Sequence, residues 1–174
     1  MTTVLEDHGF PYDVELFEED GPVLIERGQV QTLCAAVENG NPLFWDDEVA
    51  AGLTGGPVAP LTMLSAWFRP HHWEPGAAEP LVPLALHFAL KERLGLPESV
   101  VAANTLTFHD PVRPGDRLRT CQVLKSVSDV KRTQLGQGRF WVIEVRYRNQ
   151  DDALVGTDTY TMFSYRTPTG ADHD

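Results

Sequence analysis

Side chains that could exchange protons with a substrate are spread along this sequence instead of being gathered in one motif. The candidates for general acid–base catalysis are His71-His72, His87, His109 and the acidic pair Asp46-Asp47. A histidine that meets a carboxylate from another segment could add or remove a proton near neutral pH. Structural roles fit them equally, because acidic residues favour helix N-termini and histidines are common in loops, strands and interfaces.

Two further groups of residues could contact a ligand. Arginine suits phosphate groups such as those of coenzyme A, and large aromatic side chains could line an apolar acyl tunnel. The arginines are Arg113, Arg117 and Arg119, and the aromatic residues are Trp67, Phe68, Trp73 and Phe88. Ordinary surface charge and core packing are the competing explanations.

Composition argues against several classes of function. Cys34 and Cys121 have neither CxxC spacing nor paired histidines, so we expect free, buried thiols and no zinc or redox site. No glycine-rich phosphate motif is present, so no nucleotide cofactor is expected. No cluster of metal-ligating residues stands out, so no metal is expected. The net charge of −11 argues against a nucleic-acid partner. Because neither a signal-peptide pattern nor an apolar run of about 18 residues occurs, we expect a cytoplasmic protein that does not enter a membrane.

Hydrophobic periodicity predicts helices in the first half of the chain. Residues 25–38 carry apolar side chains at helical spacing and end at Asn39-Gly40, a typical helix stop. A short acidic helix is expected over 46–51. A buried, almost wholly apolar helix is expected over 57–68, and an amphipathic helix over 84–94.

The second half of the chain predicts strands. They are expected over residues 104–109, 117–127, 138–149 and 154–166, with the clearest alternation of apolar and polar side chains in the third. Helices followed by antiparallel strands predict an α+β fold. The apolar helix over 57–68 is expected to pack against a curved sheet.

One domain is expected for a chain of 174 residues. Residues 1–22 are acidic and contain several glycines and prolines, so they predict an irregular arm. The domain itself is expected over 23–166, and residues 167–174 are expected to form a flexible tail.

Four segments, in this order, resemble one known family. They are Asn41-Pro42-Leu43, Val58-Ala59-Pro60, the turn PVRPGD at 111–116, and the stretch KRTQLGQGRF at 131–140. The set resembles the MaoC-like (R)-specific enoyl-thioester hydratases and dehydratases. The ending Ala59-Pro60 is similar to the N-terminal branch of fatty-synthase-type dehydratases. The stretch 131–140 resembles the non-catalytic subunit of two-component hydratases of bacterial steroid side-chain breakdown. The resemblance implies a single hot-dog domain, in which an antiparallel sheet wraps a long central helix.

The resemblance also implies a chemistry. In this family the turn reads Asp-x-Asn-Pro-Leu-His, and its Asp and His hold the water that adds across the C=C bond of an enoyl thioester. Backbone N–H groups near the N-terminus of the central helix polarise the thioester carbonyl. Here Asn39 occupies the Asp position and Phe44 the His position, and neither side chain can carry the proton. Asn41 and Pro42 are retained, so we expect the shape of the turn without its acid–base pair.

The first functional hypothesis is therefore an acyl-CoA-binding, non-catalytic subunit of a heteromeric enoyl-CoA hydratase. It would act on a bulky acyl thioester such as a steroid side chain, with coenzyme A as part of the substrate and no other cofactor. Hydratase activity would arise only in the complex. The residues expected to bind substrate are Asn41, Pro42, Val58, Ala59, Pro60, Trp67, Phe68, Arg113 and Arg117.

The expected partner is a second hot-dog subunit that carries the Asp and His, because a lone hot-dog domain leaves a sheet edge open. One alternative is a homodimer that acts as a self-sufficient enoyl-CoA hydratase or 3-hydroxyacyl dehydratase with a rearranged acid–base pair. A weaker alternative is a hot-dog thioesterase.

Overall fold

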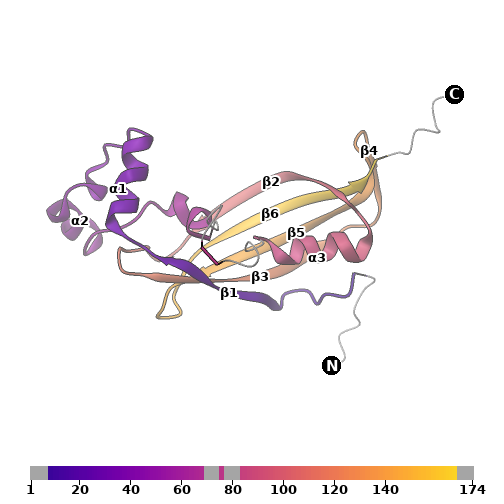
Figure 1. The fold of residues 1–174 in the computed structure, drawn as a ribbon, viewed down its shortest axis with the longest axis horizontal. Helices are drawn as coiled ribbons and strands as arrows, with labels where there is room; N and C mark the ends of the chain where they lie inside the picture. The colour runs from indigo at the N-terminus through magenta and orange to yellow at the C-terminus, as the bar shows by residue number, and fades with distance from the viewer. Residues whose placement is uncertain (1–7, 69–74, 77–82, 168–174) are drawn as a thin grey trace.

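A curved antiparallel sheet of six strands forms the frame of the protein (Figure 1). The computed structural model describes residues 8–68, 75–76 and 83–167. The sheet has the order β1-β3-β5-β6-β2, and β4 pairs with β5. The strands are β1 (Glu15–Leu24), β2 (Glu98–Phe108), β3 (Arg117–Val127), β4 (Lys131–Thr133), β5 (Gly136–Arg148) and β6 (Leu154–Arg166). The helices are α1 (Arg27–Ala36), η1 (Pro42–Phe44), α2 (Asp47–Thr54), η2 (Leu61–Phe68) and α3 (Ala85–Leu94).

The central strand β5 shows why the late strands form. Its apolar side chains Trp141, Ile143, Val145 and Tyr147 alternate along the strand and are all buried. This period of two places them on one face of the sheet, where they join the core. The strands predicted over 117–127 and 154–166 coincide with β3 and β6, and together with β5 they confirm the α+β expectation.

The prediction of one α-helix over residues 57–68 is wrong in both the helix type and the residues it covers. Only Leu61–Phe68 is helical, and it forms the 3₁₀ helix η2. The segment is so uniformly apolar that it contains little periodic signal for one helix type. Close packing against the sheet fixes it instead: a Cβ atom added to Gly156 in β6 would lie 2.4 Å from Cδ1 of Leu64.

The helix that lies along the inner face of the sheet is α3 (Figure 1). Leu86, His87 and Leu90 are its buried residues. The backbone N–H of Leu86 donates to Oε1 of Gln122 in β3 at 3.0 Å, which fixes the start of the helix against the sheet. The single hot-dog domain is thus confirmed, but its inner helical layer consists of two separate elements, η2 and α3.

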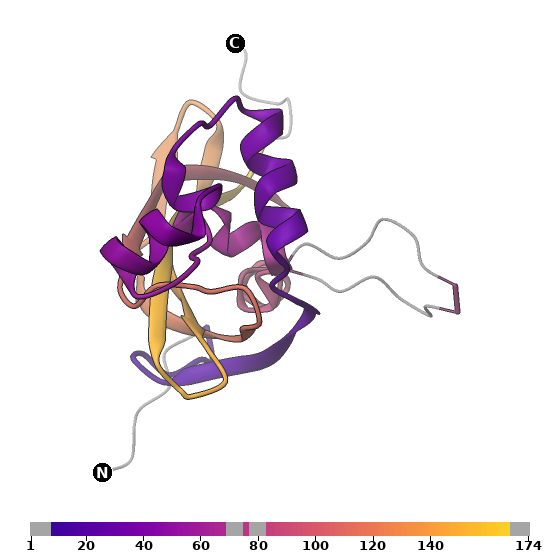
Figure 2. The same cartoon turned by 90° about the vertical axis from the view of Figure 1, so that its left-hand side faces the viewer.

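The helices α1, η1 and α2 lie at one end of the sheet, away from the end that carries β4 (Figures 1 and 2). Asp46 caps α2, because its Oδ1 accepts from the backbone N–H groups of Glu48 at 2.9 Å and Val49 at 3.1 Å. Arg27 joins α1 to α2 through an ion pair with Asp47 at 2.6 Å. This end of the molecule therefore holds the turn of interest between two helices.

The first strand of the sheet was not expected. Residues 15–22, predicted as part of an irregular arm, belong to β1, which pairs with β3. The acidic residues and Gly21-Pro22 concealed the strand, because charged, glycine and proline residues are uncommon in strands and the ladder with β3 has two register shifts. The short strand β4 was also missed. Residues 1–7, 168–174 and most of the segment 69–82 lie outside the described residues, as do His71-His72 and Trp73.

None of the helices in the described part of the chain combines the length and the apolar character needed to cross a membrane.

Candidate functional site

The turn at Asn39–Phe44 keeps its shape through its own amides. Oδ1 of Asn39 accepts from the backbone N–H of Asn41 at 3.0 Å, and Oδ1 of Asn41 accepts from that of Leu43 at 3.1 Å. The indole N–H of Trp45 donates to the carbonyl oxygen of Asn39 at 2.8 Å. Pro42 begins η1, as its fixed φ allows. Asn39 is therefore a structural part of the turn.

The two positions that the resemblance assigns to proton transfer carry side chains that cannot transfer a proton. The half-buried ring of Phe44 packs against the hydrophobic core. Asn39 is an amide, which does not titrate near neutral pH. His87 is hydrogen-bonded to Trp141 within the core, and His109 lies exposed directly after β2. Asp46 caps α2, and Asp47 forms an ion pair with Arg27.

The segment Val58-Ala59-Pro60 is buried and tied to the PVRPGD turn. The backbone N–H of Ala59 donates to the carbonyl oxygen of Val112 at 2.8 Å. That N–H group is therefore already used within the fold and is not directed at a thioester oxygen.

Arg113, predicted to meet the phosphates of coenzyme A, holds this same region together. Its Nη1 donates to the carbonyl oxygens of Gly56 at 3.1 Å and Pro57 at 3.2 Å, and its Nη2 donates to that of Thr54. Three carbonyl acceptors occupy much of one guanidinium, whose donors point in fixed directions. The structure thus gives Arg113 a local structural role.

Replacing Arg113 with lysine is expected to lower the free energy of unfolding by about 2 kcal/mol, because one ammonium group cannot match three carbonyls in the same geometry. Urea unfolding at neutral pH measures the change. The matched control is Arg117→Lys, whose exposed side chain predicts a change within about 0.5 kcal/mol. Equal stability of the Arg113 and Arg117 variants would contradict the structural role.

The remaining predicted residues lie in different surroundings. Trp67 and Phe68 are both buried in η2, and the ring of Phe68 packs edge-on against Tyr147. Arg117 lies exposed at the start of β3. Arg119, which was considered with it, forms ion pairs with Glu18 at 3.3 Å and Asp152 at 2.5 Å. Arg117 and Arg119 line one hollow beside β1, whereas Arg113 is bonded elsewhere, so the three predicted phosphate-binding arginines do not form one cluster.

A cavity of about 440 Å³ lies between β1, η2 and the inner face of the sheet, and we call it the inner cavity. It lies where η2 ends and the approach to α3 begins, since Phe68 and Leu84 both line it. Its lining also includes Glu19, Gln122, Tyr147 and Tyr160. Of the predicted substrate-binding residues, Phe68 is the one that lines this cavity.

Polar groups are unusually frequent on the wall that the sheet contributes. Glu19, Thr120 and Tyr147 lie side by side on three neighbouring strands. Tyr160 also lines the cavity, and its hydroxyl donates at 2.5 Å to Asp158, a buried residue behind the wall that also accepts from the Asn104 amide. Sequence reasoning missed this wall. The polar run Thr157–Tyr160 within an apolar strand was the available signal.

Burial shifts the ionisation of two groups in the cavity wall. It raises the pKa of the Glu19 carboxyl. It also raises the pKa of the Tyr147 phenol, with further contributions from Tyr160 and Asp158. Both groups are thereby biased toward their protonated, hydrogen-bond-donating forms.

His87 is buried and neutral. Its Nδ1 accepts from the indole N–H of Trp141 at 3.2 Å, so its proton resides on Nε2, which lies 3.3 Å from Oγ of Ser99. Burial, assisted by the positive charge of Lys91, lowers the pKa of His87 to about 4. A histidine with this pKa and these partners organises the core and is a poor general base.

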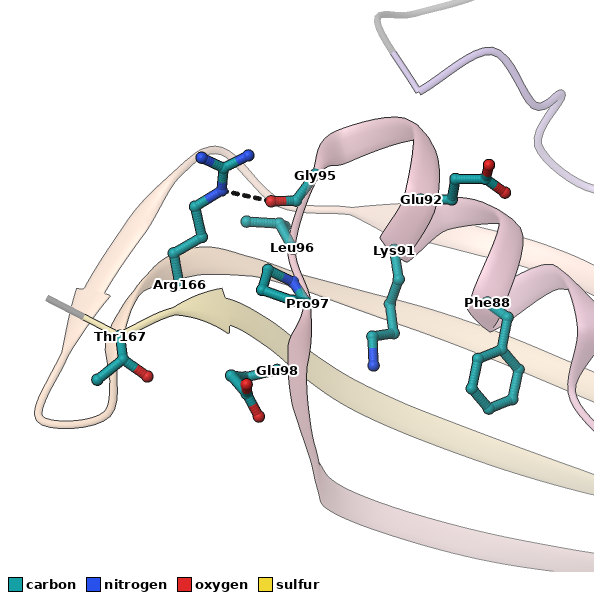
Figure 3. Close-up of a pocket in the computed structure, with 9 residues that line it drawn as sticks. All are labelled: Phe88, Lys91, Glu92, Gly95, Leu96, Pro97, Glu98, Arg166 and Thr167. Carbon is teal, nitrogen blue, oxygen red and sulfur yellow. Dashed lines mark hydrogen bonds between the residues drawn. The ribbon is translucent and has the colours of Figure 1, made fainter. Parts of the chain in front are cut away.

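A larger, shallower hollow of about 740 Å³ lies beyond the C-terminal end of α3 (Figure 3). Figure 3 shows Arg166 donating to the carbonyl oxygen of Gly95, with Lys91, Glu92 and Glu98 nearby. The charges of opposite sign are mixed here, and a helix C-terminus presents carbonyl groups, which disfavour anions. The C-terminal end of α3, which lines this hollow, lies toward the β4 end of the sheet, opposite α1 and α2 (Figure 1).

No group of three or more metal-ligating side chains occurs within residues 8–68, 75–76 and 83–167. Cys34 and Cys121 are free and buried, as the sequence predicted.

A curved antiparallel sheet around an inner helical layer, with an Asn-Pro-Leu turn at one end, defines a protein with the hot-dog fold. The chain belongs to the family described as FAS1-like, dehydratase domain region, whose family model matches residues 15–158.

Known proteins support this assignment. A protein of Thermomonospora curvata named probable enoyl-CoA hydratase alpha subunit is 31% identical over 140 residues, which are 75% of this chain and 42% of that protein. The chain therefore spans about two fifths of the length of this curated relative.

A chain in the crystal structure of the ChsH1–ChsH2 complex from Mycobacterium tuberculosis has a TM-score of 0.72 and 21% identity, covering 90% of this chain and 87% of that chain. A MaoC-like dehydratase from Rhodospirillum rubrum has a TM-score of 0.61 and 17% identity, with coverages of 91% and 99%. At these identities the two structures share the fold.

Proposed function

We propose that this chain is the acyl-CoA-binding, non-catalytic subunit of a heteromeric enoyl-CoA hydratase that acts on a bulky acyl thioester. The observation that carries the proposal is the turn at Asn39–Phe44, which keeps the Asn-Pro-Leu geometry while both proton-handling positions are inert. A chain that retains a site's shape without its chemistry is suited to complete a binding site for a neighbour.

The inner cavity supports a bulky acyl group. Its volume of about 440 Å³ falls within the range of about 300–1,000 Å³ that is common for small-molecule sites. The aromatic walls formed by Phe68 and Tyr147 would pack against an apolar group. A steroid side-chain thioester, as the resemblance implies, is one substrate of this class. Coenzyme A would remain part of the substrate, and no other cofactor is needed for hydration.

The partner is a second hot-dog subunit, which docks along β2. This edge strand exposes Val100, Val101 and Phe108, with 37%, 54% and 45% of their surfaces accessible. The opposite edge, β1, is interrupted by two register shifts and carries exposed acidic residues, features that protect an edge from pairing. The names of two similar proteins, an alpha subunit and a two-protein complex, are in keeping with such a pair.

In the complex, the partner supplies the Asp and His that bind water and transfer the proton. This chain supplies the wall around the acyl group. Orientation of the substrate by a protein that performs no chemistry still accelerates the reaction, because it holds the reacting carbon near the water.

The test is a hydration assay with trans-2-octenoyl-CoA at matched protein concentrations. The chain alone is expected to give no turnover above buffer, whereas a mixture with a co-transcribed hot-dog protein that carries the Asp and His is expected to be active. The partner alone and a mixture containing its Asp→Asn variant are the controls. Clear turnover by this chain alone would contradict the proposal and favour the alternative of a self-sufficient enzyme.

A further inference from the structure

Glu19 stands out in the inner cavity because one of its oxygens is buried without a partner. Its Oε1 is inaccessible to solvent and accepts or donates no hydrogen bond within the protein. A buried polar atom in this condition costs free energy unless something pairs with it. Since Glu19 lines a cavity, a ligand is the natural source of that pair.

The position of Glu19 is fixed by close packing. Glu19 faces Thr120 in the β1–β3 ladder. Two residues later, a Cβ atom added to Gly21 would lie 2.7 Å from the carbonyl oxygen of Leu118 and 3.1 Å from the Phe68 ring. This stretch of β1 is therefore held tightly between β3 and η2. A carboxyl on such a rigid element can hold a ligand atom at a defined place.

Two of the neighbouring polar groups already have partners within the fold, whereas Oε1 of Glu19 has none. The Tyr160 hydroxyl gives its proton to Asp158 at 2.5 Å. Oε1 of Gln122 accepts from the Leu86 backbone at 3.0 Å. A protonated Glu19 can donate to a carbonyl or hydroxyl oxygen, which burial of the carboxyl favours.

We propose that the inner cavity recognises an acyl group that carries a ketone or hydroxyl oxygen, and that Glu19 is the residue that hydrogen-bonds this oxygen. The proposal rests on the proposed function, because it specifies the acyl group that this subunit holds. It differs from simple apolar packing, which would leave Glu19 unpaired and would favour a pure hydrocarbon chain.

Two cage molecules of nearly equal shape test the proposal on the full chain. They are 2-adamantanone and 2-methyleneadamantane, in which a C=CH₂ group replaces the C=O group. Dissociation constants are measured by titration of backbone amide NMR shifts. The ketone is expected to bind about fivefold to tenfold more tightly, which is the effect of one neutral hydrogen bond.

Three variants test whether Glu19 causes the preference for the ketone. Glu19→Leu is expected to abolish it and to bind the hydrocarbon at least as well as the native chain does. Glu19→Gln retains an N–H donor and should keep part of the preference. Glu18→Leu, at the exposed neighbour of Glu19, is the matched control and should keep all of it. Thermal unfolding of each variant checks that it is folded.

Three outcomes would overturn the proposal: equal affinity of the native chain for both molecules, no binding of either, or a preference for the ketone that survives in Glu19→Leu. Because neither molecule contains coenzyme A or an enoyl group, these outcomes are independent of the hydration assay. A failure of specificity is thus separated from a failure of the proposed function.

Discussion

Replacing Gly138 with alanine is expected to lower the free energy of unfolding by about 3 kcal/mol or more. A Cβ atom at this position would lie 2.0 Å from the carbonyl oxygen of Ser164 and 2.6 Å from Cα of Tyr165. Both atoms belong to the backbone of β6, so no side chain can rotate to relieve the clash. The strands β5 and β6 would have to separate locally, which breaks ladder hydrogen bonds in addition to the overpacking.

Gly52→Ala is the matched control for this substitution. Gly52 lies inside α2, and a Cβ atom added there meets nothing within 4 Å. Alanine at an open helical position is expected to raise stability by about 0.5–1 kcal/mol. Urea unfolding of both variants gives the comparison. A stability loss at Gly138 no larger than the change at Gly52 would refute the close approach of β5 to β6.

The same packing explains part of the family resemblance. Gly136 has φ +144°, and a Cβ atom there would lie 2.1 Å from the carbonyl oxygen of Arg166. The Gly-Gln-Gly pattern in 131–140 therefore serves the joining of β5 to the end of β6. This segment is a marker of the fold, and its glycines touch no part of the inner cavity lining.

Acidification is expected to destabilise the protein through His87 by about 2 to 3 kcal/mol. The folded-state pKa of His87 is about 4, below its ordinary value of 6.5. As the pH falls below 6.5, the unfolded chain binds a proton at this histidine while the folded protein does not. Stability contributed by neutral His87 is thus complete above pH 6.5 and is lost progressively between pH 6.5 and 4.

His87→Asn isolates this contribution from that of the carboxylates. An asparagine at this position can place its amide oxygen near the Nδ1 position that accepts from the Trp141 indole, and it does not titrate in this range. Urea unfolding of both proteins at several pH values between 7 and 4 gives the comparison. The native chain should lose more stability than the variant over this interval. Parallel pH profiles would show that His87 is not held neutral in the fold.

Local pattern was sufficient for those elements that have one clear apolar face. The strands β3 and β6 and the helix α3 were predicted within a residue or so, because their side-chain periods are read directly from the sequence. By contrast, η2 was predicted as a longer α-helix because an almost wholly apolar segment shows no preferred face. The strand β1 was missed because its acidic residues and register shifts hide the alternation.

Residue identity by itself determined the chemistry available at the turn. Asn39 and Phe44 cannot carry a proton in any fold, so the two positions that the resemblance assigns to the acid–base pair are inert whatever surrounds them. The tertiary structure decided the roles that depend on distant neighbours. Arg113 binds the carbonyl of Thr54, and Oε1 of Glu19 becomes buried beside β3 and η2, because folding joins segments that are far apart in the chain. Burial and pairing are properties of those contacts, and no local pattern specifies them.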